Sequence, residues 1–259
     1  MERMRVAVIT GAAQGIGRQI AETLAVRGYA LAVNDLRPPD DTLAALGAHR
    51  ANAEAFVGDV SDDGFVARFA EGVVARFGGV AVLVNNAGIS CISRAEETSA
   101  AQLRRVLEVN LVAPFMLCRA FGALMLAARA GSIVNIASIA GLVGVAERTA
   151  YNASKHGLIG LTRTLAAEWG SRGVRANAVC PGWVKTEMDV AAQAGGHYAD
   201  DDITSRIPLG RFASPDDVAQ AVAFLADPRQ SGFVNGATLA VDGGWTADGS
   251  WQRLRDSQR

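Results

Sequence analysis

Short apolar runs alternate with longer amphipathic segments along almost the whole chain. The short runs are apolar at consecutive positions, which predicts strands that are buried on both faces of a sheet. These runs lie at Arg5–Thr10, Ala30–Asp35, Ala55–Val57, Val80–Asn85, Ser132–Ala137, Val174–Val179 and Thr238–Val241. The longer segments repeat apolar residues every three or four positions, which predicts helices at Gly15–Arg27, Phe65–Phe77, Ala100–Ala128, Tyr151–Gly170 and Pro215–Ala226. This alternation predicts an α/β fold, with about seven strands in a doubly wound parallel sheet and helices on both faces.

No linker interrupts the alternation, so we expect a single domain over residues 1–245 and a polar tail over 246–259. The proline-rich segment Arg37–Asp41 falls where a turn from strand to helix is expected. Only Lys185–Phe212 lacks clear periodicity. A connection of this length is typical of a lid, so we expect a lid over about 185–212.

Composition and charge remove several classes of protein. Hydrophobic residues make up 50% and charged residues 20% of the chain, which excludes intrinsic disorder. The net charge of −1 gives no attraction to nucleic acid or to an anionic membrane. Arg119 and Arg129 interrupt the longest apolar stretch, so we expect no membrane span. The three cysteines lie far apart and in no metal-binding spacing, which predicts no metal site and a reducing, cytoplasmic compartment.

Glycine is abundant, with 28 of 259 residues against a usual ~7%, and three glycines stand directly after the first strand. Gly11, Gly15 and Gly17 form the pattern G-x-x-x-G-x-G. Glycines permit a sharp turn and a close approach of the backbone, and the helix that begins here presents free N–H groups to a pyrophosphate. The turn therefore predicts a dinucleotide site on a Rossmann-type fold.

Asp35 ends the second strand, at about the distance from the glycines where an acid accepts hydrogen bonds from the adenosine ribose. The same carboxylate repels a 2′-phosphate, so we expect NAD rather than NADP. Arg37 could pair with that phosphate and keeps NADP open. Asp59, after the third strand, either contacts the adenine edge or caps the helix that follows it.

Tyr151 and Lys155 stand four residues apart at the start of a predicted helix, and therefore on one face of it. A nearby ammonium group favours the phenolate and lowers the pKa of tyrosine from its usual value of about 10. The pair predicts that Tyr151 acts as a general acid/base.

Several motifs occur together in one order along the chain. They are Thr10-Gly11-x-x-x-Gly15-Ile16-Gly17, Asn85-Asn86-Ala87-Gly88, Asn110, Ser138, Tyr151-x-x-x-Lys155 and Pro181-Gly182. In these residues the chain resembles the classical short-chain dehydrogenase/reductase family, from Val6 to about Trp245. The resemblance implies a homotetrameric oxidoreductase that interconverts a secondary alcohol and a ketone by hydride transfer with NAD.

The resemblance also implies a role for each catalytic residue. Tyr151 would exchange a proton with the substrate oxygen, and Ser138 would hydrogen-bond that oxygen. Lys155 would lower the pKa of Tyr151 and hold the nicotinamide ribose. Asn110 would support a water-linked proton relay to Lys155.

The expected binding residues fall into two groups. The cofactor would contact Gly11, Gln14, Gly15, Ile16, Gly17, Asp35, Asp59, Val60, Asn86, Ala87, Gly88, Tyr151, Lys155, Pro181, Gly182, Val184 and Thr186. The small-molecule substrate would contact Ser90, Ile92, Ser138, Val143, Glu147, Trp183 and Met188. Trp183 either covers an apolar substrate or packs at the base of the lid. Glu147 and Arg148 form a charged pair that either meets a polar substrate or is solvated.

Two other functions remain open on the same fold. One is an NADPH-dependent reductase of 3-oxoacyl thioesters on acyl carrier protein, against which Asp35 speaks. The other is a cofactor-sensing binding protein, against which the presence of all four catalytic residues speaks. The fold alone does not decide between them.

Overall fold

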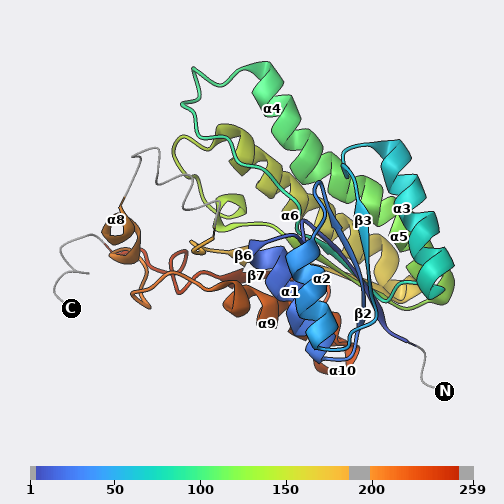
Figure 1. Ribbon diagram of the computed structural model, residues 1–259. Coiled ribbons are helices and arrows are strands. Elements are labelled where there is room, and N and C mark those ends of the chain that lie inside the picture. Colours follow the sequence, from blue (N-terminus) through green and yellow to red (C-terminus); the bar gives the residue numbers. More distant parts are fainter. Residues whose placement is uncertain (1–3, 187–198, 251–259) are drawn as a thin grey trace.

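The computed structural model describes residues 4–186 and 199–250, and its central feature is a parallel sheet (Figure 1). The strands are β1 (Val6–Thr10), β2 (Ala30–Asp35), β3 (Ala53–Val57), β4 (Val82–Asn85), β5 (Gly131–Ile136), β6 (Val174–Pro181) and β7 (Thr238–Val241). They pair in the order β3-β2-β1-β4-β5-β6-β7, and every neighbouring pair is parallel. The strand order reverses between β1 and β4, which is where a doubly wound sheet binds its ligand. The predicted strands and their parallel arrangement are confirmed.

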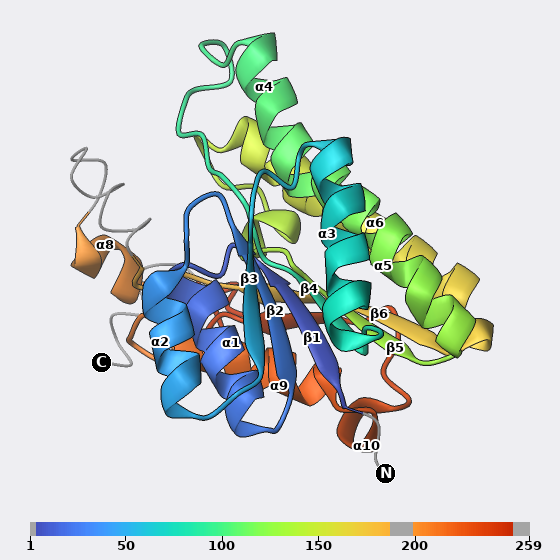
Figure 2. The ribbon, with the colours of Figure 1, turned by 45° about the vertical axis from the view of Figure 1, so that its right-hand side comes forward.

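Two layers of helices explain why the strands are apolar on both faces. One face of the sheet is covered by α1 (Gly15–Val26), α2 (Asp40–Ala48) and α9 (Pro215–Ala226), and the other by α3 (Asp63–Phe77), α5 (Ala113–Ala128) and α6 (Thr149–Trp169) (Figure 2). Ile20 and Leu24 of α1 are fully buried in the first layer. Phe69 of α3 and Phe121 of α5 meet edge to face in the second, with 5.2 Å between ring centroids.

The predicted helix over Ala100–Ala128 is continuous but not uniform. It consists of α4 (Ala100–Leu107), a π-helical turn over Glu108–Val112, and α5. Among the described residues it is the one helix that is long and apolar enough to cross a membrane. Leu117, Phe121 and other residues of α5 are buried against the sheet, so packing inside the protein accounts for its apolar character.

The structure adds elements that the sequence pattern does not predict. Helix α2 occupies Asp40–Ala48, so it begins within the turn predicted over Arg37–Asp41 and continues where no helix is predicted. Asp40 and Asp41 lie in its first turn, where acids favour the helix dipole, and Leu46 is buried. A short helix, α8 (Asp200–Thr204), lies inside the expected lid. Another, α10 (Pro228–Ser231), follows α9.

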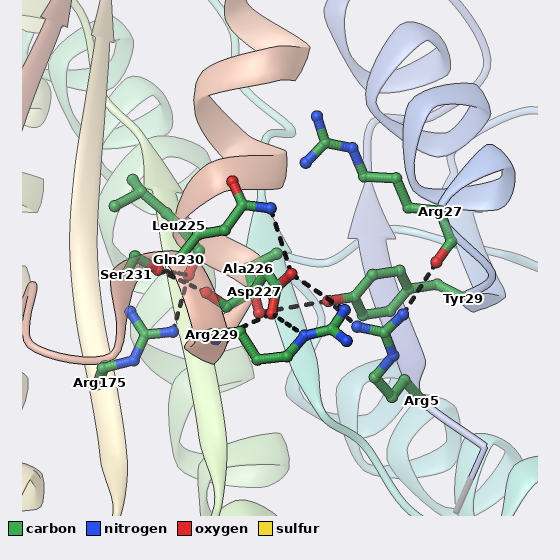
Figure 3. Close-up of polar contacts among 10 residues, drawn as sticks. All are labelled: Arg5, Arg27, Tyr29, Arg175, Leu225, Ala226, Asp227, Arg229, Gln230 and Ser231. Carbon is green, nitrogen blue, oxygen red and sulfur yellow. Dashed lines mark hydrogen bonds and ion pairs between the residues drawn. The ribbon is translucent and has the colours of Figure 1, made fainter. Parts of the chain in front are cut away.

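A polar cluster lies at the amino-terminal ends of the strands, on the side of the sheet opposite to the carboxyl-terminal ends where a doubly wound sheet binds its ligand (Figure 3). The Tyr29 hydroxyl donates to the carbonyl of Ala226 at 3.3 Å, and Arg175 donates to the carbonyl of Leu225 at 2.9 Å. Asp227 accepts the backbone N–H of Arg229 at 3.0 Å and so caps α10. These bonds tie the end of α9 to the sheet, far from the edge where the strands end.

Candidate active site

The strand ends surround a cavity of about 610 Å³ at the carboxyl edge of the sheet. A parallel sheet gathers residues that are distant in sequence at this edge, because all of its strands point the same way. The structure brings most of the predicted site residues to the wall of this cavity. They are Gly11, Gln14, Gly15, Ile16, Gly17, Asp35, Asn86, Ala87, Gly88, Ser90, Ile92, Ser138, Tyr151, Lys155, Pro181, Gly182, Trp183, Val184 and Thr186.

The glycine turn between β1 and α1 has a backbone that side chains would obstruct. Gly11 and Gly15 have positive φ angles of 65° and 56°. A Cβ atom on Gly17 would collide with the Gly11 carbonyl and lie 2.5 Å from Nδ2 of Asn86. Helix α1 has no side-chain hydrogen bond at its N-cap, Gln14, so its first N–H groups face the cavity without a side-chain acceptor. This arrangement fits the pyrophosphate of a dinucleotide.

Asn86 joins the glycine turn to the end of β4. Its Nδ2 donates to the carbonyls of Thr10 and Gly11, both at 3.0 Å. The Thr10 hydroxyl in turn accepts the backbone N–H groups of Asn86 and Ala87, both at 3.1 Å. These four bonds fix the relative position of the two strand ends that border the cavity.

Asp35 and Arg37 lie together at the end of β2. The Asp35 carboxylate accepts the backbone N–H of Ala13 at 3.0 Å, which supports the glycine turn. Arg37 donates to Oε1 of Gln14 at 3.0 Å, and its side chain also lines the cavity. A negatively charged carboxylate and a positively charged guanidinium are therefore both present where the adenosine ribose of a dinucleotide would lie.

Lys155 is buried on α6, with 3% of its surface exposed. Its ammonium group donates to the carbonyl of Ile136 at 2.8 Å and lies 5.4 Å from the centroid of the Tyr151 ring. Burial lowers the pKa of Lys155 from 10.5 to about 8. Burial therefore weakens the preference of this lysine for its charged form.

Opposing influences act on the pKa of Tyr151. Burial, the largest effect, raises the pKa of Tyr151, while a hydrogen bond with Ser138 and the charge of Arg148 lower it. The sequence predicts that Lys155 is the cation that lowers this pKa. In the structure the charge of Arg148 lowers it, and the Lys155 ammonium lies 5.4 Å from the centroid of the Tyr151 ring.

Asn110 lies in the π-helical turn between α4 and α5 and is fully buried. Its Oδ1 accepts the backbone N–H of Ile89 at 2.9 Å, and its Nδ2 donates to the Ile89 carbonyl at 2.9 Å and to Oγ of Ser154 at 3.1 Å. A π-turn is frequent at functional sites because it redirects one side chain out of the regular helix. Asn110 thus holds the loop after β4 against α6, behind the cavity wall.

Four predicted binding residues do not reach the cavity wall. Asp59 accepts bonds from Ser61 and Arg105, and Val60 is buried in the core. Val143 donates its backbone N–H to the Ile139 carbonyl and does not line the cavity. Glu147 is exposed, and its Oε1 lies 3.9 Å from Nε of Arg94. A fifth, Met188, lies outside the described residues.

The cavity wall also contains residues that the sequence analysis did not assign to it. They are Ile136, Ala137, Ile139 and Ala140 around Ser138, together with Val145. Arg37 and Arg148, which the sequence leaves as possible contacts of a phosphate and of a polar substrate, also line the cavity. Among the described residues no group of three or more histidine, cysteine or acidic side chains could hold a metal ion.

Comparisons with known proteins agree with this geometry. A family profile described as enoyl-(acyl carrier protein) reductase matches residues 11–246. D-threitol dehydrogenase of Mycolicibacterium smegmatis is 43% identical over 244 residues, which are 93% of this chain and 93% of that one. The chain belongs to the classical short-chain dehydrogenase/reductase family.

Two further relatives of this short-chain dehydrogenase/reductase extend the comparison. Cis-4-hydroxycyclohexanecarboxylate dehydrogenase of Sinomonas cyclohexanicum is 42% identical over 245 residues, covering 94% of this chain and 97% of that one. A crystal structure from Beutenbergia cavernae with NADP bound at low occupancy is 44% identical, covers 95% of this chain and 98% of that one, and has a TM-score of 0.89. The protein is an oxidoreductase that acts on a CH–OH group with a nicotinamide cofactor.

Proposed function

We propose that this enzyme interconverts a secondary alcohol and a ketone, with NAD as hydride carrier and Tyr151 as general acid/base. The observation that supports this most directly is that Ser138, Tyr151 and Lys155 line the same cavity as the glycine turn and Asp35. One cavity therefore offers proton-transfer groups and a dinucleotide cradle together.

The proposed mechanism uses the hydroxyl groups of Ser138 and Tyr151 to hold the substrate oxygen. In the oxidation, the phenolate form of Tyr151, which the charge of Arg148 favours, takes the alcohol proton, while the Ser138 hydroxyl donates its hydrogen bond to the substrate oxygen. The nicotinamide, when bound, accepts the hydride from the carbinol carbon. Lys155 passes the proton onward. Asn110 positions the loop at Gly88, and the side chains of Lys155 and Asn110 both lie close to this glycine. In the reduction the proton moves the other way.

NAD is proposed as the preferred cofactor because Asp35 would repel a 2′-phosphate. Two observations favour NADP instead: Arg37 lines the same end of the cavity, and the solved relative contains NADP. The ratio of activities with the two cofactors, together with Asp35→Ala, decides between them.

The names of the relatives suggest the kind of alcohol. One acts on D-threitol, a polyol, and another on a cyclic hydroxy acid. Ile92, Val145 and Trp183 give the cavity apolar walls, which suit a ring or a short carbon chain. The description of the family profile favours a second candidate, reduction of an acyl thioester on acyl carrier protein. A panel of polyols, cyclic alcohols, hydroxy acids and 3-oxoacyl thioesters, assayed by nicotinamide absorbance, separates these substrates.

We also propose a cytoplasmic homotetramer, with residues 1–245 as one catalytic domain; of the expected lid over 185–212, residues 187–198 lie outside the described residues. The free thiols of Cys91, Cys118 and Cys180 support a reducing compartment. Exposed apolar residues on α5 support subunit contacts.

The decisive test of the mechanism is Tyr151→Phe. We expect turnover to fall by about 10²- to 10⁴-fold, because the ring keeps its place while the proton-transfer group is lost. NADH binding, measured by fluorescence, should be unchanged. Tyr29→Phe is the matched control, since the buried Tyr29 lies at the opposite edge of the sheet and should retain full turnover. Full activity of Tyr151→Phe would refute the mechanism.

A further inference from the structure

Arg148 is the N-cap residue of α6, and its side chain lines the active-site cavity. It stands three residues before Tyr151 and seven before Lys155, so all three share one face of the helix. Its charge already reaches the Tyr151 hydroxyl, whose pKa it lowers. Arg148 therefore belongs to the end of the cavity where the substrate reacts.

The backbone before α6 separates Arg148 from the adjacent acid. Glu147 has a positive φ of 60°, and its carbonyl accepts the backbone N–H of Ser93 at 2.9 Å. The Glu147 carboxylate lies outward, 3.9 Å from Arg94, whereas Arg148 lines the cavity. Although Glu147 and Arg148 are adjacent in the sequence, the Glu147 carboxylate thus does not neutralise the charge of Arg148 in the cavity.

The Arg148 guanidinium has no acceptor for one of its nitrogens. Nη1 is buried and has no hydrogen-bond partner within the described residues, and no described acid forms an ion pair with Arg148. Of the described residues that line the cavity, Asp35 is the one acid, and it lies at the adenosine end, where its carboxylate bonds Ala13. Arg148 as a whole is only partly buried, but a buried donor without a partner is still unfavourable.

We propose that Arg148 binds a carboxylate of the substrate, so that the enzyme acts on secondary hydroxy acids and the corresponding oxo acids rather than on neutral alcohols. This inference rests on the proposed function, because the carboxylate must be held while the hydroxyl reacts at Tyr151. A neutral hydroxyl would satisfy the Nη1 donor, but only an anion also neutralises the charge. A planar guanidinium pairs well with a carboxylate, through charge-assisted hydrogen bonds.

The first experiment compares each hydroxy acid with its primary amide, which keeps the shape and removes the charge. One pair is 4-hydroxypentanoate and its amide, and the other is 3-hydroxycyclohexanecarboxylate and its amide. We expect the wild-type enzyme to prefer the acid. In Arg148→Gln both substrates lose the charge that lowers the pKa of Tyr151, but kcat/KM for the acid should fall by about 10- to 100-fold more than that for the amide. Arg148→Lys, which keeps the charge, should recover part of the loss.

Two controls distinguish binding of the carboxylate from a general structural effect. Arg94→Gln removes an exposed arginine beside Glu147 and should leave the preference for the acid unchanged. Rates are compared on the pH plateaus, because loss of Arg148 raises the pKa of Tyr151 and should move the pH profile of amide oxidation to higher pH. Equal losses for acid and amide would overturn the proposal.

A binding measurement separates this proposal from the proposed function. Cyclohexanecarboxylate and pentanoate have no hydroxyl to react, and we expect calorimetry to detect their binding to the enzyme with NAD. Arg148→Gln should weaken that binding by about 10- to 100-fold, whereas Tyr151→Phe should not change it. Turnover of neutral alcohols without carboxylate binding would overturn the role of Arg148 and leave the proposed function intact. If carboxylate binding depends on Arg148 but no alcohol is oxidised, the role of Arg148 would stand and the proposed function would be overturned. Tighter binding of cyclohexyl phosphate than of cyclohexanecarboxylate would overturn the assignment to carboxylates.

Discussion

At the scale of single residues, burial governs the chemistry of the site. Burial favours the neutral form of each group, so the pKa of Tyr151 rises while that of Lys155 falls to about 8. The charge of Arg148 acts against the effect of burial on Tyr151 by lowering its pKa. In the proposed mechanism this charge favours the form of Tyr151 that accepts a proton.

The preference for NAD is tested at Asp35. In Asp35→Ala the hydrogen bonds to the ribose and the repulsion of a 2′-phosphate disappear together. We expect the ratio of kcat/KM with NAD to that with NADP to fall by at least about 10-fold, the size of a lost charge-assisted hydrogen bond. The ratio is the proper measure because the substitution also removes the bond to Ala13, which supports the turn for either cofactor. Asp41→Ala, at an exposed acid of α2, should leave the ratio unchanged. A native preference for NADP would contradict the role given to Asp35.

The sequence predicts some site residues better than others, for a physical reason. Gly17, Asp35 and Tyr151 stand at the ends of regular elements, so their spacing alone places them at the edge of the sheet. Glu147 and Arg148 stand in irregular backbone, and the left-handed conformation of Glu147 helps decide which of the two faces the cavity. No periodicity anticipates that conformation, so the sequence alone cannot separate the two charges, whereas in the structure Arg148 lines the cavity and Glu147 lies beside Arg94.

At the scale of elements, the strands were predictable because burial on both faces leaves an uninterrupted apolar run. Helix α2 was not, because its two first-turn acids follow two prolines and resemble a turn. The π-turn was also hidden, since one extra residue within Ala100–Ala128 hardly disturbs a helical pattern. That turn nevertheless brings Asn110 to the loop after β4, so a local irregularity has a consequence for the site.

The glycine turn allows a test of an element as a unit. In Gly17→Ala the new methyl group would collide with the Gly11 carbonyl, and the turn would have to move. We expect the free energy of unfolding to fall by about 1–3 kcal/mol and NADH to bind at least about 10-fold more weakly. Thermal unfolding and a fluorescence titration measure the two effects.

The matched control for that substitution is Gly47→Ala in α2. No atom lies within 4 Å of a Cβ atom at Gly47, and the residue is exposed near the end of a helix. There alanine should be neutral or should stabilise the protein by up to about 1 kcal/mol. If Gly17→Ala binds NADH as tightly as the wild type, the turn can accommodate the methyl group and the prediction is wrong.

At the scale of the whole molecule, the two edges of the sheet have different tasks. The carboxyl edge gathers the glycine turn, the acid of β2 and the proton-transfer groups into one cavity. The amino edge carries a polar cluster whose bonds run between α9, α10 and the sheet (Figure 3). Substitutions at the amino edge are therefore expected to change stability before they change catalysis.

The outer side of α5 provides the test of assembly. Phe115 of α5 is 47% exposed and Val112, at the end of the π-helical turn just before it, is 36% exposed, although the rest of α5 is strongly apolar and packed on the sheet. Exposed apolar side chains on a helix that lies outside the sheet are typical of subunit interfaces, so we expect light scattering to give about four times the 27.0 kDa of one chain. Phe115→Lys should reduce that mass, because a charge would be buried without a partner at the interface. Val26→Lys, which places the same charge at an exposed apolar residue of α1 on the other face of the sheet, should leave the mass unchanged. A wild-type chain that scatters as a monomer would exclude the tetramer, and it would leave the exposed residues of α5 without the role proposed for them.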